Sequence, residues 1–338
     1  MQKAFITGLS GPAITPAERA FLAAERPAGL ILFARNCESP GQIRALVADF
    51  KAAVATDRVL IAVDQEGGRV QRLRPPIARE LPAAARYGAV FEHDPRLAVE
   101  AASLVARLTA EELKAHGIDT CCAPVLDVPV PGAHDVIGDR AYGGALDGIV
   151  RLGRAVAEGL MAGGVLPVMK HIPGHGRALA DSHLELPVVE APPAVLAATD
   201  FVPFAALADL PAAMTAHVVF SGLDPGRPAS ISSSVTGGII RARIGFDGLL
   251  MSDDLSMRAL SGTLGERTEA VLSAGSDLAL HCNGDLAEMQ AVAAAAPALR
   301  GRAAQRFARA LSVARAPPGA FDRERAGLLL ERLLGAIA

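Results

Sequence analysis

The sequence of 338 residues has no tryptophan, only two tyrosines and 11 phenylalanines. Because long nucleic acids and polysaccharides commonly stack on aromatic side chains, this scarcity argues against such binding platforms. The charge offers no alternative for nucleic acid, since 33 Lys and Arg against 36 Asp and Glu give a net charge of −3, with both signs scattered along the chain. We therefore expect a small-molecule ligand and no nucleic-acid partner. A sugar would be held mainly by polar contacts.

Cysteines and long apolar runs are also scarce. Cys37, Cys121, Cys122 and Cys282 contain no C-x-x-C spacing, so neither a disulfide framework nor a zinc knuckle is predicted, and a reducing compartment is favoured. No window holds 18 uncharged apolar residues, and the N-terminus reaches Gly8 too early to contain the apolar core of a signal peptide. We expect a cytoplasmic protein with no membrane partner.

Apolar residues make up 51% of the chain and charged residues 20%, which is typical of a globular protein with a sizeable core and excludes a disordered chain. Short apolar runs rich in strand-forming residues recur between helical segments. There are eight such runs, at residues 4–8, 29–33, 59–63, 118–123, 165–169, 213–218, 248–252 and 277–281. Their nearly unbroken apolar character is typical of strands buried on both faces, as in parallel sheets.

Helix-start signals lie between these runs. Thr15-Pro16-Ala17-Glu18 and Ser39-Pro40-Gly41-Gln42 each combine a capping hydroxyl, a proline in the first turn and a Glu or Gln three residues after the cap. A third helix is predicted from Asp94-Pro95 to about His116, ended by Gly117. Eight strand–helix units predict an α/β fold with a single (β/α)8 barrel of the TIM type. The alternative is a doubly wound open sheet, but no G-x-G-x-x-G follows the first strand.

The chain is predicted to form a single domain, because no Ser/Gly linker, low-complexity tract or charge run interrupts it before the eighth strand. The barrel is expected over about 4–300 and a helical tail over about 301–338. The end of the tail has an amphipathic pattern whose apolar members are Leu328, Leu329, Leu330, Leu333, Leu334 and Ile337. We expect a final helix that packs on the barrel of a monomer, with a contact between two copies as the less favoured alternative.

Unusual polar clusters directly follow several predicted strands. In a (β/α)8 barrel the active site is built at the C-terminal ends of the strands, so these clusters predict its place. They are Asp64-Gln65-Glu66-Gly67-Gly68-Arg69-Val70-Gln71-Arg72, Ile137-Gly138-Asp139-Arg140, Lys170-His171-Ile172-Pro173-Gly174-His175-Gly176, Asp181-Ser182-His183 and Ser252-Asp253-Asp254. A lone acidic turn would be read as solvated, but its place at a strand end favours a functional role.

Lys170 and His171 follow a wholly apolar strand, where a ligand-facing cationic pair is more reasonable than a solvated one. A zinc site with His171 and His175 is the disfavoured alternative, because the proline and glycines around them prevent the helix on which a His-x3-His pair binds metal. His217, at the end of the sixth strand, is a further candidate for the pocket lining. We expect no metal and no cofactor.

Asp181 and His183 are two residues apart in a loop of small and polar residues, so the carboxylate can orient the imidazole for proton transfer near neutral pH. Asp253 shares the strand parity of Leu249, whereas Asp254 has the opposite parity. Only one of the two acids is therefore expected to point into the site. On these grounds either acid could be a nucleophile.

Together, the motifs D-Q-E-G-G-R-V-Q-R, I-G-D-R, K-H-I-P-G-H-G, D-S-H and S-D-D-L-S-M, in this order, resemble those of the bacterial β-N-acetylglucosaminidases (β-hexosaminidases) of glycoside hydrolase family 3, the NagZ type of peptidoglycan recycling. The resemblance spans residues from about 5 to 285. It implies a (β/α)8 barrel that removes a non-reducing terminal N-acetylglucosamine from muropeptides carrying 1,6-anhydro-N-acetylmuramic acid. Ile172 stands where this family usually has phenylalanine, a departure that leaves the chemical groups intact.

Matched residue by residue, the resemblance implies that Asp253 is the nucleophile and that His183 is the general acid/base, oriented by Asp181. The implied sugar-binding residues are Asp64, Arg72, Arg140, Lys170 and His171. The implied mechanism retains the β configuration: Asp253 attacks the anomeric carbon while His183 protonates the departing oxygen, and His183 then deprotonates water. The segment 171–186 is expected to close over bound substrate.

Four alternatives remain open at this point. Substrate-assisted catalysis would use Asp253 and Asp254 to polarise the acetamido group instead of forming a covalent intermediate. A β-glucosidase of the same family commonly needs an additional domain. A metal-dependent barrel hydrolase would use His171, His175 and Asp253, and a sugar-binding barrel would be catalytically silent.

Overall fold

The computed structural model describes residues 1–180, 182 and 185–335. Within these residues the main sheet has nine strands, all paired in parallel, in the order β7-β6-β3-β2-β1-β13-β12-β10-β8. The strands are β1 (Lys3–Thr7), β2 (Pro27–Leu32), β3 (Leu60–Val63), β6 (Thr120–Cys121), β7 (Leu166–Pro167), β8 (Met169–Ile172), β10 (Ala212–Thr215), β12 (Leu249–Asp254) and β13 (Leu278–His281). β7 and β8 are the two edges of this order, yet Val168 alone separates them in the chain, so the sheet closes into a barrel.

The predicted (β/α)8 barrel is confirmed, and each of the eight predicted runs contributes to the sheet. The fifth run, predicted as one strand at 165–169, is divided: β7 pairs with β6, and β8 pairs with β10. Between them, the N–H of Val168 donates to the carbonyl oxygens of Cys121 (2.9 Å) and Ala123 (3.0 Å). The fifth stretch of the barrel therefore pairs first with β6 and then with β10. It is counted as two strands, and for this reason the eightfold barrel contains nine strands.

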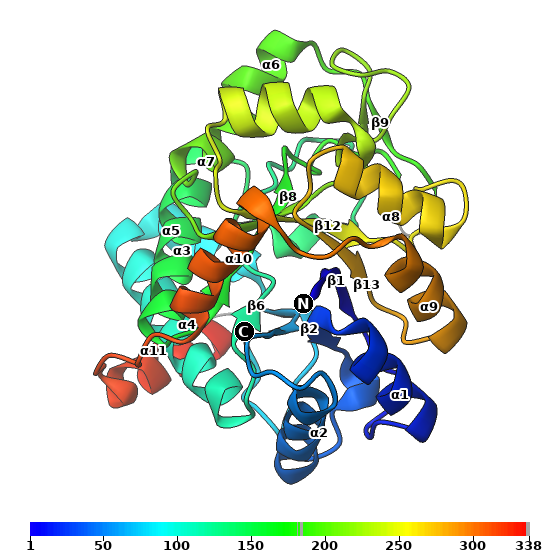
Figure 1. The fold of residues 1–338 in the computed structure, drawn as a ribbon. Helices are drawn as coiled ribbons and strands as arrows, with labels where there is room; N and C mark the ends of the chain where they lie inside the picture. The colour runs from blue at the N-terminus through cyan, green and yellow to red at the C-terminus, as the bar shows by residue number, and fades with distance from the viewer. Residues whose placement is uncertain (181, 183–184, 336–338) are drawn as a thin grey trace.

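Helices surround the strands in Figure 1. They are α1 (Pro16–Glu25), α2 (Pro40–Ala53), α3 (Ala84–His93), α4 (Pro95–Ala115), α5 (Leu146–Ala162), α6 (Pro193–Ala198), α7 (Phe201–Ala206), α8 (Leu264–Ser273) and α9 (Leu286–Ala295), with a π-helix η4 (Val235–Arg243) after β10. The predicted starts are confirmed: the hydroxyl of Thr15 accepts from Glu18 N–H and the Glu18 carboxylate accepts from Thr15 N–H, while Ser39 and Asp94 cap α2 and α4.

Short elements complete the C-terminal end of the barrel. They are the antiparallel pair β4 (Gln65–Gly67) and β5 (Val70–Gln71), the parallel pair β9 (Val188–Val189) and β11 (Val219–Phe220), and the 3-10 turns η1 (Ala34–Asn36), η2 (Gly138–Arg140) and η3 (Ala229–Ile231). Each of these elements follows a barrel strand, as loops that carry a site do in this fold.

The barrel strands are buried on both faces, as their composition predicted. Ile6, Ile31 and Met251 pack with one another inside the barrel, whereas Leu30 and Ile61, from the alternate positions, join the layer between strands and helices. Burial of apolar surface in both layers stabilises the fold and leaves charged side chains to the strand ends.

The helix α10 (Gly301–Ala314) lies across the N-terminal end of the barrel (Figure 1). The N–H of Leu299 donates to the carbonyl oxygen of Gln2 at 2.8 Å, and Phe307 and Leu311 pack with the residues that fill the barrel interior. Because this end is closed by apolar packing, the polar pocket of the barrel opens at the opposite, C-terminal end.

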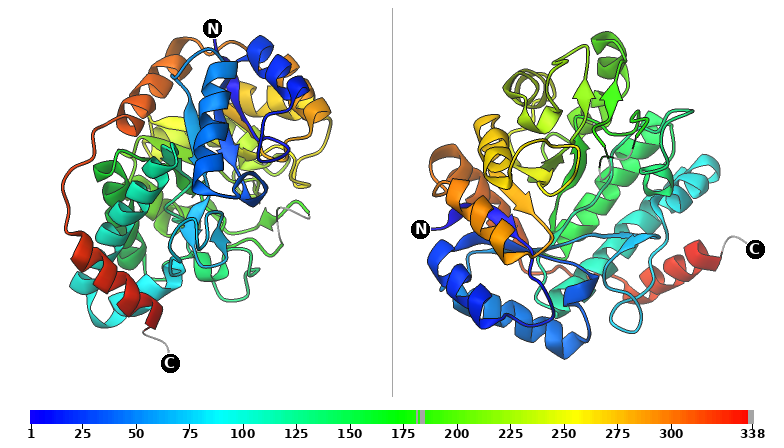
Figure 2. Two further views of the ribbon diagram at one scale, coloured as in Figure 1. Left: turned by 90° about the horizontal axis from the view of Figure 1, so that it is seen from below. Right: turned by 90° about the vertical axis from the view of Figure 1, so that its right-hand side faces the viewer.

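The predicted final helix is α11 (Arg323–Gly335), which packs on α4 at the edge of the molecule (Figure 2). Its buried residues are Ala326, Leu329, Leu330 and Leu333. Arg323 and Arg325 pair with Glu111 and Glu100 of α4. Of the other apolar residues of the pattern, Leu328 and Leu334 are 60% and 40% exposed, and Ile337 lies outside the described residues. Among the described helices none is long and apolar enough to cross a membrane.

Asp119, buried beside the start of β6, is predicted to make stability depend on pH. Its Oδ1 accepts from the N–H of Ile61 (2.7 Å) and the hydroxyl of Thr120 (3.0 Å), and burial raises the pKa of its carboxyl from 3.8 to about 6. Because the folded state binds this proton more tightly than the unfolded state, the contribution to stability is full below about pH 4 and is lost as the pH rises through about 6.

The side-chain amide of the Asp119→Asn variant does not titrate in this pH range. Relative to wild type, its free energy of unfolding is therefore expected to gain about 2 kcal/mol between about pH 4 and about pH 8. Urea unfolding of both proteins at the two pH values checks this, and a difference that does not change with pH would contradict it.

Candidate active site

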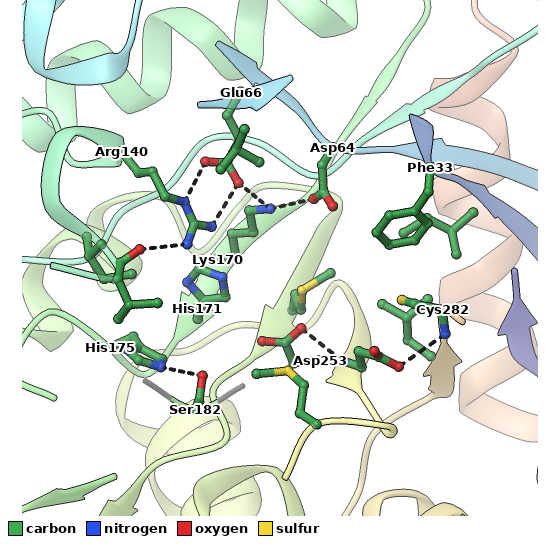
Figure 3. Close-up of a pocket in the computed structure, with 18 of the residues that line it drawn as sticks. Phe33, Asp64, Glu66, Arg140, Lys170, His171, His175, Ser182, Asp253 and Cys282 are labelled. Atoms are coloured by element: carbon green, nitrogen blue, oxygen red, sulfur yellow. Dashed lines mark hydrogen bonds and ion pairs between the residues drawn. The ribbon is translucent and has the colours of Figure 1, made fainter. Parts of the chain in front are cut away.

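A polar pocket of about 570 Å³ lies at the carboxyl ends of the barrel strands (Figure 3). This volume is in the range of small-molecule sites. The structure brings six of the predicted residues into its lining, from the ends of four barrel strands, β3, β6, β8 and β12: Asp64, Arg72, Arg140, Lys170, His171 and Asp253. Glu66, Ser182 and Asp254 line it as well. The clusters after separate strands therefore converge on one site, as the barrel geometry predicts.

Lys170 lies at the centre of a buried network of charges. Its Nζ is 2.7 Å from Asp64 Oδ1 and 2.6 Å from Glu66 Oε1, and its side chain is 3% exposed. Arg72 donates to the other oxygen of Asp64 at 2.9 Å. Arg140 binds Glu66 through two parallel hydrogen bonds of 2.8 and 2.9 Å, a geometry that guanidinium and carboxylate groups favour. Each charge is thus held in place by at least one opposite charge.

The network keeps its members ionised. Burial alone would raise the pKa of the Asp64 and Glu66 carboxyls, but the charge of Lys170, with those of Arg72 and Arg140, holds both pKa values below their usual range. Burial likewise disfavours the charged form of Lys170, yet Asp64 and Glu66 raise the pKa of its ammonium group. The pocket therefore presents fixed donors and acceptors to a ligand without a change of protonation near neutral pH.

Glu66 is a site residue that sequence reasoning quoted in a motif but gave no role. Its position two residues after Asp64 could have indicated a role in the site, because alternate residues of an extended chain point to the same side. Its contacts with Lys170 and Arg140 join residues more than 70 positions apart in the chain, which no local pattern reveals.

His171 is oriented by Asp127, which sequence analysis missed altogether. The fully buried Asp127 carboxylate accepts from His171 Nδ1 at 2.7 Å, from the N–H of His171 at 3.2 Å and from the N–H of His175 at 2.7 Å. Although burial would raise it, the pKa of Asp127 is held low by the neighbouring histidines. The Nδ1 contact leaves the Nε2 edge of His171 as the side available to a ligand.

His175 points at Ser182, with 3.0 Å between Nε2 and Oγ (Figure 3). Burial and the charge of His171 lower the pKa of His175 to about 4, so its ring is neutral near pH 7. Asp181 and His183, the predicted acid/base pair, lie outside the described residues. Ser182, which stands between them in the chain, is buried and lines the pocket.

The two acids that end β12 have different surroundings. Asp253 follows the parity of Leu249 and Met251 inside the barrel, and its Oδ1 accepts from the N–H of Asp254 at 2.8 Å. The Asp254 carboxylate instead accepts from the N–H groups of Cys282 and Ser256, each at 3.1 Å, and from the Ser256 hydroxyl. Among the described residues, Asp253 thus keeps an oxygen without a hydrogen-bond donor, whereas both oxygens of Asp254 are engaged.

Asp253 is ionised in this setting. Burial would raise the pKa of its carboxyl, but the charge of His171, the N–H of Asp254 and the charge of Lys170 hold the pKa below its usual range. An ionised carboxylate with one unengaged oxygen is chemically able to attack an electron-poor carbon.

One aromatic side chain, Phe33, also faces the site (Figure 3). The guanidinium groups of Arg35 and Arg72 lie 5.0 and 4.9 Å from its ring centroid. The ring therefore supports Arg72, the partner of Asp64. Across the described residues, no group of three or more His, Cys, Asp or Glu side chains is placed to bind a metal ion.

Comparison with known proteins places this site in a family. The chain matches the model described as "Glycosyl hydrolase family 3 N terminal domain" over residues 5–314. A β-hexosaminidase of Alkalilimnicola ehrlichii is 43% identical over 280 residues, which cover 82% of this chain and 79% of the relative. Another, from Methylobacillus flagellatus, is 44% identical over 260 residues, 75% of this chain and 73% of the relative.

Solved structures agree with these relatives. NagZ from Neisseria gonorrhoeae, in complex with N-trifluoroacetyl-D-glucosamine, has a TM-score of 0.88 and 32% identity and covers 98% of each chain. A family 3 β-N-acetylglucosaminidase from Paenibacillus sp. str. FPU-7 has a TM-score of 0.87 and 30% identity, covering 98% of this chain and 66% of that one. The polar pocket at the strand ends is accordingly that of a glycoside hydrolase, and the chain belongs to glycosyl hydrolase family 3.

Proposed function

We propose that this family 3 glycoside hydrolase is a retaining exo-β-N-acetylglucosaminidase that removes the non-reducing terminal N-acetylglucosamine from GlcNAc-1,6-anhydro-MurNAc and its peptides, in the recycling of peptidoglycan. Its curated relatives are β-hexosaminidases. The observation that carries the finer proposal is the placement of ionised Asp253 in the same pocket as the network around Lys170. We also propose a cytoplasmic monomer, in keeping with four free cysteines in the structure.

The network around Lys170 supports the binding of one sugar ring. Asp64 offers carboxylate oxygens as acceptors for hydroxyl groups, while Lys170, Arg72 and Arg140 offer charged donors, and charge-assisted hydrogen bonds are the stronger and more directional kind. His171 adds the Nε2 edge of its ring. The related Neisseria protein was solved with an N-acylated glucosamine. We infer that the same kind of sugar occupies this pocket, with its anomeric carbon toward Asp253.

The proposed chemistry is a double displacement. The unengaged oxygen of Asp253 attacks the anomeric carbon, the bond to the leaving oxygen breaks, and that oxygen receives a proton from His183, which Asp181 orients. A glycosyl ester of inverted configuration forms on Asp253. His183 then takes a proton from water, whose oxygen displaces the carboxylate and restores the β configuration. Most retaining glycosidases use two carboxyl groups for these roles, so a histidine acid/base departs from the common arrangement.

The reaction is tested by incubating the protein with GlcNAc-1,6-anhydro-MurNAc-peptide and following the products by proton NMR from the first turnover. We expect free N-acetylglucosamine to appear first as the β anomer, because two inversions retain configuration, and to mutarotate afterwards. First appearance of the α anomer would contradict the double displacement, and no release from this substrate would contradict the substrate assignment.

Two matched assays separate the alternatives. An aryl N-acetyl-β-glucosaminide compared with the aryl β-glucoside distinguishes this activity from that of a β-glucosidase. A 5-fluoro glycosyl donor should label Asp253. Turnover of the natural substrate without any labelling would favour substrate-assisted catalysis instead.

A further inference from the structure

His217, at the C-terminal end of β10, is buried beside the pocket and has no part in the chemistry described above. Its Nε2 is 3.1 Å from the carbonyl oxygen of Asp254, and its Nδ1 is 2.7 Å from Oγ of Ser230. A carbonyl oxygen can only accept, so Nε2 carries the hydrogen. Burial lowers the pKa of His217, so the ring is neutral and Nδ1 accepts from the equally buried Ser230 hydroxyl. The two contacts therefore select one tautomer.

Hydrogen bonds fix both the backbone and the side chain of Asp254. Its N–H donates to Oδ1 of Asp253 at 2.8 Å, its carbonyl oxygen accepts from His217, and its carboxylate accepts from the N–H groups of Cys282 and Ser256. These partners come from the segment after β10, from the loop after β13 and from the turn after β12. The residue that binds one oxygen of Asp253 is thus itself fixed by separate parts of the barrel.

The pairing of β12 with β13 is irregular at Asp253. The register shifts between Met251 and Asp254, so a bulge carries Asp253 just before the pairing resumes between Asp254 and Leu280. Such irregularities redirect side chains near active sites and leave local backbone groups unpaired. The carbonyl oxygen of Asp254 finds its partner in the His217 ring instead of a neighbouring strand.

We propose that His217, with Ser230 behind it, is a positioning residue for Asp253: it holds the Asp254 backbone whose N–H binds one oxygen of the carboxylate, and so directs the other oxygen toward the anomeric carbon. The inference rests on the proposed role of Asp253 as nucleophile. It assigns His217 no contact with the substrate. Loss of the contact lets the carboxylate rotate or shift, and a displacement of about 1 Å in a reacting group costs about 100-fold in rate.

A matched pair of variants tests this role. In His217→Gln the amide nitrogen reaches about the place of Nε2 and can still donate to Asp254, whereas in His217→Asn the same amide is one carbon shorter. We expect the Asn variant to lower the rate constant for labelling of Asp253 by a 5-fluoro glycosyl donor by about 100-fold, and the Gln variant by less than about 10-fold. Inhibition constants for N-acetylglucosamine should stay within about twofold, because the sugar-binding network is untouched.

Ser230→Ala gives an independent reading, since it removes the partner of Nδ1 without adding volume, and a labelling rate lowered by about 5- to 10-fold is expected. Thermal unfolding and the final extent of labelling report the folded, active fraction, so a merely structural effect would appear there and not in the rate constant. Equal slowing of the Gln and Asn variants, or a wild-type rate in the Asn variant, would overturn the positioning role. Wild-type turnover without labelling of Asp253 would overturn the proposed nucleophile and this inference together.

Discussion

Asp253→Ala is expected to lower kcat/KM for aryl N-acetyl-β-glucosaminides by about 10⁴-fold or more, because the carboxylates of Asp64, Glu66 and Asp254 are engaged by donors on both oxygens. The fold should persist, since the only hydrogen bond of this carboxylate among the described residues is to the adjacent Asp254 N–H. The measurement is steady-state kinetics together with thermal unfolding of both proteins.

Azide provides the diagnostic control for Asp253→Ala. On an activated aryl substrate, azide can attack the anomeric carbon in the space left by the carboxylate as the aryloxide departs, which should restore turnover and yield the α-glycosyl azide through a single inversion. Asp254→Asn is the matched control. Because the Asp254 carboxylate accepts from the N–H groups of Cys282 and Ser256, a much smaller loss of kcat/KM is expected. Activity of Asp253→Ala within about tenfold of wild type would remove Asp253 as the nucleophile.

Lys170→Met is expected to have the largest effect on stability, lowering the free energy of unfolding by about 3–5 kcal/mol at pH 7. The change removes the cation between Asp64 and Glu66, whose oxygens lie 2.7 and 2.6 Å from its Nζ, and leaves two buried carboxylates close together. Arg72 and Arg140 remain at the far sides of the pair and cannot replace a charge between them. Urea unfolding of wild type and variant measures the difference.

The pH dependence of Lys170→Met has a definite sign. In wild type the pKa values of Asp64 and Glu66 are lowered, so their contribution to stability is present above the ordinary values of 3.8 and 4.5 and is lost as the pH falls below them. The destabilisation should therefore be greatest at neutral pH and shrink below about pH 4. Arg302→Ala is the control, because that guanidinium is 78% exposed and its pairing with Asp247 should contribute less than about 1 kcal/mol. Similar losses in the two variants would contradict the role given to Lys170.

Local features of the chain were predictable because their causes are local. Thr15, Ser39 and Asp94 cap helices within three residues of themselves, and the apolar runs are strands because both of their faces are buried. The barrel also places the C-terminal ends of all its strands on one side, so the clusters that contain Lys170 and Asp253 could be assigned to one pocket from the sequence. The expectation that only one of Asp253 and Asp254 points into the site was wrong, because both acids line the pocket after the register shift in β12.

The missed features arise from contacts between distant segments. The sequence around Asp127 gives no sign of its hydrogen bond to His171, which depends on the fold. Likewise, the role of Glu66 depends on its contacts with Lys170 and Arg140. The division of the fifth strand at Val168 has the same origin, because it depends on how the barrel closes between β6 and β10.

The amino-acid sequence by itself determined the elements of this protein, the barrel, the end of the barrel that carries the site and the family to which the chain belongs, because periodicity, capping and motif order are properties of neighbouring residues. Only the tertiary structure decided which charges are paired, which oxygen of Asp253 is left unengaged among the described residues, and that His217 bears on Asp254. Hydrogen bonds and ion pairs act over about 3 Å, and folding alone sets which side chains come within that distance.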